Sequence, residues 1–190
     1  MRAITLRLNR IYEFFTKKGF MNFLKGIFLM SLFSMIFGSG AKAAQSKDSF
    51  PDEKFMVVEA TLNNKPVVGS FNAAYKEYSL KKKYPWCLKL AIALDEGNLF
   101  ANGLPKGEES AVANKLEDEL VEKIQSLTTA HYLGHLFNDT FLDIYIYLDS
   151  PEMVHMYLQT QVNKDGLVRA IAYEITQDPE WLLVAPFIKK

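Results

Sequence analysis

The sequence predicts an α+β fold in which a ferredoxin-like split β-α-β sheet carries two helices on one face and is joined by an N-terminal β-hairpin. Three observations predict it. Several short runs alternate apolar and polar residues, as half-buried strands do. One long segment, 106–127, repeats its apolar residues at helical spacing. From Trp86 onward, the predicted elements follow one another in the order β-α-β-β-α-β.

The N-terminal hairpin is predicted from two β-type runs, 55–62 and 67–71. The residues between them, Asn-Asn-Lys-Pro at 63–66, favour a turn because Asn tolerates the left-handed conformation and Pro fixes φ. The polar and aromatic segment 72–83 predicts irregular structure.

The first strand and helix of the split motif come next. Residues 86–94 alternate as in a strand that is covered heavily on one side, and the Gly- and Asn-rich segment 95–105 predicts a loop. Helix 106–127 opens with two glutamates, which favour the positive end of the helix dipole. Its apolar stripe consists of Val112, Leu116, Leu120, Ile124 and Leu127. The remaining faces carry Glu117, Asp118, Glu119, Glu122 and Lys123.

A second hairpin is predicted from runs 131–137 and 141–148 around a turn at 138–140. One face of the second run is wholly aliphatic and must lie in the core; it consists of Leu142, Ile144, Ile146 and Leu148. The other face is polar and aromatic, and we expect it to point outward; it consists of Phe141, Asp143, Tyr145 and Tyr147.

The last elements are a helix at 152–162, opened by Pro151, and a strand at 167–176. The apolar tail 181–188 is expected to dock on the domain.

The N-terminal region has the pattern of a cleaved secretory signal peptide, residues 1–43. An eleven-residue apolar run, 27–37, precedes the small residues Ala41 and Ala43, the predicted recognition site of signal peptidase. The mature chain would begin at Ala44. Either Met21 is the true start or the leader has a genuine extension. Export to the periplasm or out of the cell follows from this interpretation.

The same region argues against a permanent membrane anchor. The apolar run is shorter than the about 20 residues that span a bilayer, and no Cys is present there to carry a lipid. The rest would comprise a flexible lead-in at 44–53 and a single α+β domain at 54–190.

The charge balance excludes a phosphate-backbone binder. Of the 22 basic and 22 acidic residues, seven basic and one acidic precede Ala44, which leaves 15 and 21, a net charge of about −6. Such a domain lacks the positive surface that nucleic-acid binding needs. The single cysteine, Cys87, lies in an apolar run and is expected to be buried and inert.

Several short motifs, taken in their order and spacing, resemble the domain-of-unknown-function family 695. They are Tyr84-Pro85-Trp86, the segments 102–105 and 116–120 with Glu108-Glu109 between them, Tyr145-Ile146-Tyr147, and the segment 178–181. The resemblance covers residues 54–188. It implies a compact α+β domain of bacteria and no known reaction.

Some members of that family look fused to a domain similar to the regulator of ribonuclease E activity, which would suit a binding role. We expect this chain to lack room for such a domain and to carry an export leader, so we do not expect a role in RNA metabolism here.

Two sets of residues are candidates for metal or acid–base chemistry. His131 and His135 would share a metal ion on a helix, but on the predicted strand they lie about 13 Å apart, too far for one ion. We therefore predict no metal site and no cofactor. Asp139 and Asp143 could act as paired carboxylates of a hydrolase.

The favoured function is a non-enzymatic module that binds an envelope protein or a small ligand through a sheet face. Its candidate binding residues are Asp143, Tyr145 and Tyr147. The alternative is a small periplasmic hydrolase that uses the carboxylates around Asp139 and Asp143. A purely structural domain of an envelope assembly is a third possibility.

Overall fold

A computed structural model describes residues 50–162 and 164–188, all of which lie in one compact unit. The predicted signal peptide, with Ala41 and Ala43, and most of the predicted lead-in lie outside the described residues. In the part of the chain that is described, no helix is long and apolar enough to cross a membrane.

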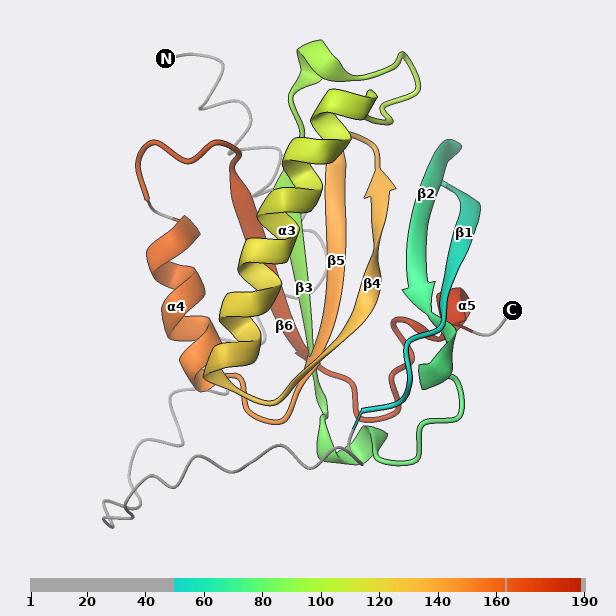
Figure 1. Cartoon of the computed structure of the whole chain (residues 1–190), viewed down its shortest axis with the longest axis vertical. Coiled ribbons are helices and arrows are strands. Elements are labelled where there is room, and N and C mark those ends of the chain that lie inside the picture. The colour runs from blue at the N-terminus through green and yellow to red at the C-terminus, as the bar shows by residue number, and fades with distance from the viewer. Residues whose placement is uncertain (1–49, 163, 189–190) are drawn as a thin grey trace. The chain divides into compact units, whose positions relative to one another are not determined.

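The centre of the domain is one antiparallel sheet of six strands, in the order β1-β2-β4-β5-β3-β6 (Figure 1). The strands are β1 (Phe55–Leu62), β2 (Lys65–Asn72), β3 (Trp86–Ala93), β4 (Ala130–Asn138), β5 (Phe141–Leu148) and β6 (Ile171–Gln177). Each predicted strand is confirmed, although the last begins at Ile171 instead of residue 167. Strands β1 and β6 form the two edges of the sheet.

Two helices, α3 (Gly107–Leu127) and α4 (Glu152–Val162), lie on one face of the sheet (Figure 1). They connect β3 to β4 and β5 to β6, which confirms the predicted succession β-α-β-β-α-β. The predicted aliphatic residues of β5 face these helices and are fully buried there. A short helix, α5 (Ala185–Ile188), belongs to the C-terminal segment, which packs against the opposite face.

Both hairpins turn in two residues. Asn63 and Asn64 have φ angles of 51° and 62°, and Asp139 and Thr140 have φ angles of 40° and 77°. Two left-handed residues in succession match the twist of the flanking strands. The predicted four-residue turn 63–66 is therefore shortened, because Lys65 and Pro66 already pair with β1.

A bulge in β4 changes which way its side chains point. The pairing of β4 with β5 shifts register between Tyr132 and Gly134. Gly134 has a φ of 146°, and a Cβ atom there would lie 2.1 Å from the backbone oxygen of Ser70. Only glycine fits. As a consequence His131 and His135, four residues apart, lie on opposite faces of the sheet.

The buried side of α3 is rotated from the predicted stripe. Glu117, expected on a solvated face, is only 4% exposed, whereas Val112 and Leu116 are half-buried. The residues of α3 that are fully buried are Glu109, Ala113, Glu117, Leu120 and Ile124. The two buried glutamates are accommodated because each has hydrogen-bond partners from another element.

Candidate functional site

The three residues predicted as an outward binding face are buried. Asp143 is 3% exposed, Tyr145 9% and Tyr147 0%. The C-terminal segment covers the two tyrosines: Trp181 stacks on Tyr147 with ring centroids 4.1 Å apart, and the Phe187 ring lies 6.0 Å from that of Tyr145. The expectation of an outward face is therefore wrong. The docking of the tail, which is its physical cause, was itself predicted and is confirmed by the full burial of Trp181 and Val184.

The two candidate carboxylates of a hydrolase have separate ionic partners. Asp143 forms an ion pair with Lys89 at 2.9 Å and accepts a hydrogen bond from Asn138. Asp139 lies in the turn after β4 and pairs with Lys65. We assign neither residue an acid–base role.

The two histidines of β4 have different surroundings. His131 is buried among aromatic rings, including those of Tyr84 and Trp181, and its Nδ1 atom lies 3.0 Å from the Tyr75 hydroxyl. Burial lowers the pKa of His131 to about 4, so the ring is neutral at ordinary pH. Within the described residues, no group of three or more His, Cys, Asp or Glu side chains is placed to hold a metal ion.

The single cysteine is buried as predicted. Burial raises the pKa of the Cys87 thiol to about 12, which leaves it protonated and unreactive.

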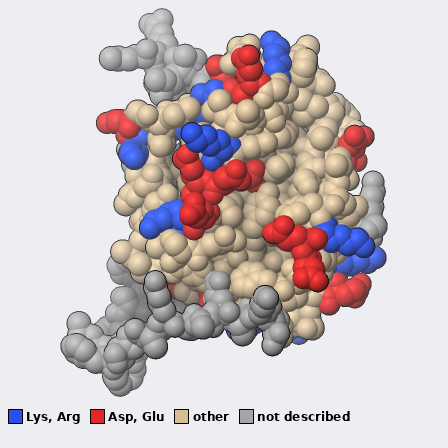
Figure 2. Space-filling model, in the orientation of Figure 1, with Lys and Arg blue, Asp and Glu red and all other residues tan. Residues whose placement is uncertain are grey.

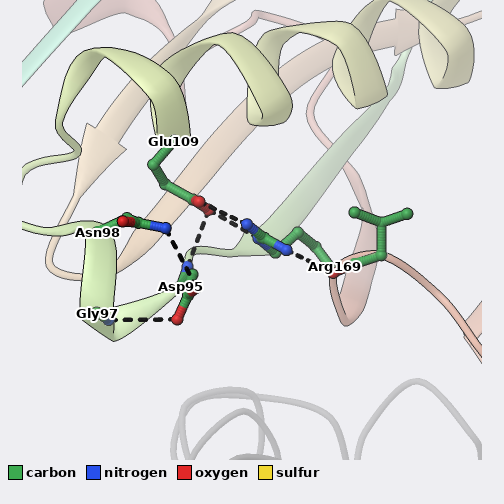
Figure 3. A network of polar contacts seen from close by, with 6 residues as sticks. Asp95, Gly97, Asn98, Glu109 and Arg169 are labelled. Carbon is green, nitrogen blue, oxygen red and sulfur yellow. Dashed lines mark hydrogen bonds and ion pairs between the residues drawn. The ribbon is translucent and has the colours of Figure 1, made fainter.

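A network at the start of α3 joins this helix to the loop after β3 and to the loop before β6 (Figure 3). Arg169 donates to both carboxylate oxygens of Glu109, at 2.7 and 2.5 Å, and the backbone N–H of Asp95 donates to the same carboxylate at 2.9 Å. The hydrogen bonds from Arg169 are the main reason that the pKa of Glu109 is lowered. Every member has its partner inside the network, so we interpret it as structural.

The surface that remains is the part of the sheet beyond α3. In Figure 1, strands β1 and β2 have no helix in front of them. We call their helix-side residues, with those of β4, the open sheet face. From the strand register it comprises Phe55, Val57, Glu59, Thr61, Pro66, Val68, Ser70, Tyr132, His135 and Phe137. Phe55 is 44% exposed and Val57 69%. Figure 2 shows that the surface beside α3 here is largely free of charged side chains.

A polar cluster lies where α3 borders the open sheet face. The Tyr132 hydroxyl donates to Glu117 at 2.8 Å, and the Nδ1 atom of His135 lies 2.8 Å from the other carboxylate oxygen. Burial and the charge of Glu117 raise the pKa of Tyr132, so its hydroxyl remains a donor. Since Nδ1 faces the Glu117 carboxylate, Nε2 points away from that carboxylate.

A second acceptor lies on the same side of α3. Asn114 precedes Glu117 by one turn, and its Oδ1 atom is buried with no hydrogen-bond partner among the described residues. Asn114 lies on the opposite side of α3 from Lys123, because the two residues are nine positions, or two and a half turns, apart. The ammonium group of Lys123 is 5.9 Å from the Tyr157 ring of α4. Asn114 therefore lies on the side of α3 opposite α4, which is the side of the open sheet face (Figure 1).

The outer edge of this face is strand β1, whose backbone groups alternate between two directions. Its even-numbered residues bond to β2, as shown by the hydrogen bond from the N–H of Ala73 to the carbonyl of Lys54 just before the strand. The N–H and C=O groups of the odd-numbered residues point to the free edge. They belong to Phe55, Val57, Glu59 and Thr61, the same residues whose side chains lie on the open sheet face.

Sequence reasoning missed this site because the contact between β4 and α3 is non-local. A strand with the sequence around His135 gives no sign that its histidine faces a buried glutamate of α3. The signal that could have shown it is Gly134, because a glycine within a strand often marks a bulge.

Comparisons with curated proteins and with solved structures gave no match. One family model matches residues 53–187, close to the range 54–188 over which the motifs resemble that family. The match spans both edge strands, the three helices and the open sheet face. The protein belongs to the family of unknown function DUF695.

Proposed function

We propose that this protein is an exported, non-enzymatic binding module with a ferredoxin-like core, and that it binds an extended segment of a partner protein as an additional strand along β1. The observation that carries the proposal is the free edge of β1, an eight-residue strand without Pro or Lys. Natural edge strands are usually protected by such residues, and an unprotected edge is a template for another chain.

The ferredoxin-like assignment is supported by the arrangement of the four strands other than β1 and β2. Their order in the sheet is β4-β5-β3-β6, and the two crossover connections both contain a helix. In this proposal β1 and β2 extend that core and carry the binding edge.

A comparison of the two edges favours β1. Phe55, Val57 and Leu62 are exposed large apolar residues of β1, whereas β6 contributes none. An extended segment suits this surface better than a small ligand does, because the groups that need partners lie in a row along the strand. The added strand would pair its backbone with the odd-numbered residues and extend the open sheet face.

The test is selection of random 12-residue peptides displayed on phage against the purified protein, followed by affinity measurements on two variants. Val57→Pro removes an N–H that points outward, so it should abolish peptide binding while leaving the β1–β2 pairing intact. The matched control, Val57→Thr, keeps the N–H and β propensity and should bind within a few-fold of wild type.

Equal binding by the two variants would contradict strand addition. Failure to select any peptide, with a concentration-dependent dimer in sedimentation experiments, would assign the edge to a second copy of this chain instead.

Export is tested separately. Mass spectrometry of the protein purified from the producing cell should find Ala44 as the first residue. An intact leader on the soluble protein would contradict processing between Ala43 and Ala44.

A further inference from the structure

We propose that Asn114, Glu117 and His135 form a subsite for a guanidinium group, carried by an arginine of the segment that pairs with β1. The inference rests on the proposed function for the origin of that arginine, but the subsite itself is independent of the β1 edge. It is a recognition site for a cationic side chain and involves no chemical step.

The first support is a buried carboxylate that lacks a permanently charged partner. Glu117 is 4% exposed, and its partners are a neutral hydroxyl from Tyr132 and the imidazole of His135. In the described residues it has no lysine or arginine partner. The other buried glutamate of α3, Glu109, is paired with Arg169. A buried carboxylate is stabilised by a cation far more than an exposed one, because the surroundings screen the charges less.

The second support is an excess of acceptors. In the neutral tautomer whose Nδ1 donates to Glu117, the Nε2 atom of His135 is an acceptor, and it has no hydrogen-bond partner among the described residues. The buried Oδ1 atom of Asn114 likewise lacks a donor. A carboxylate, an imidazole nitrogen and an amide oxygen, all on one side of α3, call for a ligand with several donors.

Guanidinium fits this set better than other groups. It has five N–H donors in a planar fork and is weakly hydrated, so it is the cation most readily buried. It also stacks on aromatic rings. The neighbouring rings of Phe55 and Tyr132, whose centroids are 6.1 Å apart, offer such a surface.

The composition of the open sheet face argues for a different protein as the source. The face contains no Lys or Arg, and its one charged strand residue is Glu59. A second copy of the chain that paired through β1 would bring the same face and hence no cation to the acceptors. Charge complementarity therefore favours a basic partner.

The test uses N-acetyl-arginine methylamide as the probe and its citrulline analogue as the neutral, nearly isosteric control. Both are titrated into the purified protein while the ring proton signals of His135 are followed by NMR. We expect a saturable shift with the arginine probe, and at least tenfold weaker binding of the citrulline probe. Glu117→Gln should reduce this preference to less than twofold.

Two further variants keep the result interpretable. Glu122→Gln removes the same charge from an exposed position on α3 and should leave the preference unchanged. His135→Phe, observed through the Tyr132 ring signals, should also weaken arginine binding if Glu117→Gln proves unstable. Equal binding of the two probes to wild type, or an unchanged preference in Glu117→Gln, would overturn the subsite.

The outcome is separable from that of the peptide experiment. Val57→Pro should leave binding of the arginine probe intact, since the probe does not use the edge. Loss of the subsite with intact peptide pairing contradicts only this inference, and the reverse result contradicts only strand addition.

Discussion

The hydroxyl of Tyr147 donates a hydrogen bond to Oδ2 of Asp178 at 2.5 Å, in the interior of the domain. Asp178 also accepts hydrogen bonds from the backbone N–H groups of Leu182 and Leu183, each at 2.9 Å. The indole N–H of Trp181 reaches the carbonyl of Tyr84 at 3.0 Å. Tyr84, Tyr147, Asp178 and Trp181 belong to the short motifs by which the chain resembles its family, and their contacts hold the C-terminal segment against the sheet.

The first prediction concerns this attachment. Tyr147→Phe removes the hydroxyl from Asp178 and should lower the free energy of unfolding by about 1–3 kcal/mol, because a buried carboxylate loses a donor. Trp181→Ala removes the stacked ring as well and should cost about 3–5 kcal/mol. Urea denaturation measures both. Equal, negligible effects would mean that the tail is not part of the folded core.

The second prediction concerns acid stability. The pKa of His131 is about 4 in the folded protein and 6.5 in an unfolded chain, so below pH 6.5 the unfolded state binds the proton first. Stability should therefore fall between pH 6.5 and 4, by up to about 3 kcal/mol from this residue. Thermal unfolding of wild type and His131→Gln across that range checks it. Parallel pH profiles for the two proteins would contradict the buried neutral imidazole.

The third prediction concerns the bulge in β4. Gly134→Ala places a methyl group against the backbone oxygen of Ser70 at a φ that only glycine readily adopts. It should destabilise the domain by about 3 kcal/mol or more, from strain and overpacking. Gly107→Ala is the matched control, because a Cβ atom there meets nothing within 4 Å. Comparable melting temperatures for the two variants would argue against the bulge.

The fourth prediction concerns the network at the start of α3. Arg169→Ala leaves the carboxylate of Glu109 buried without its cation, which should cost about 3–5 kcal/mol. Lys82→Ala removes an exposed ion pair with Glu180 and should change stability little. Chemical denaturation of the two variants separates these roles, and a similar small effect of both would show that Glu109 does not depend on Arg169.

Most elements of the fold were predictable because their signals are local. The paired left-handed residues of each turn, the helical spacing of α3 and the aliphatic face of β5 are properties of short segments. The failures are non-local. Nothing near Tyr147 shows that Trp181, more than thirty residues later, covers it, and alternation alone reads the same way for a solvated face and for a face covered by a tail.

The polar cluster around Glu117 was not predictable for a related reason. The burial of Glu117 depends on Tyr132 and His135, and these reach it because the bulge at Gly134 places His135 on the helix side. A stripe of leucine and isoleucine residues fixes the buried side of a helix only approximately. A glutamate at the border of the apolar stripe can be buried if it has hydrogen-bond partners, and the buried side of the helix then shifts although the apolar pattern is unchanged.

The central claim is that β1 accepts another strand, and amide hydrogen exchange resolved by residue tests it most directly. Without a partner, the amides of Val57 and Glu59 should exchange rapidly, whereas those of Val58 and Ala60, bonded to β2, should be protected. After addition of a peptide selected on the protein, Val57 and Glu59 should become protected too. If the peptide binds and these two amides still exchange as fast as before, strand addition at β1 is wrong.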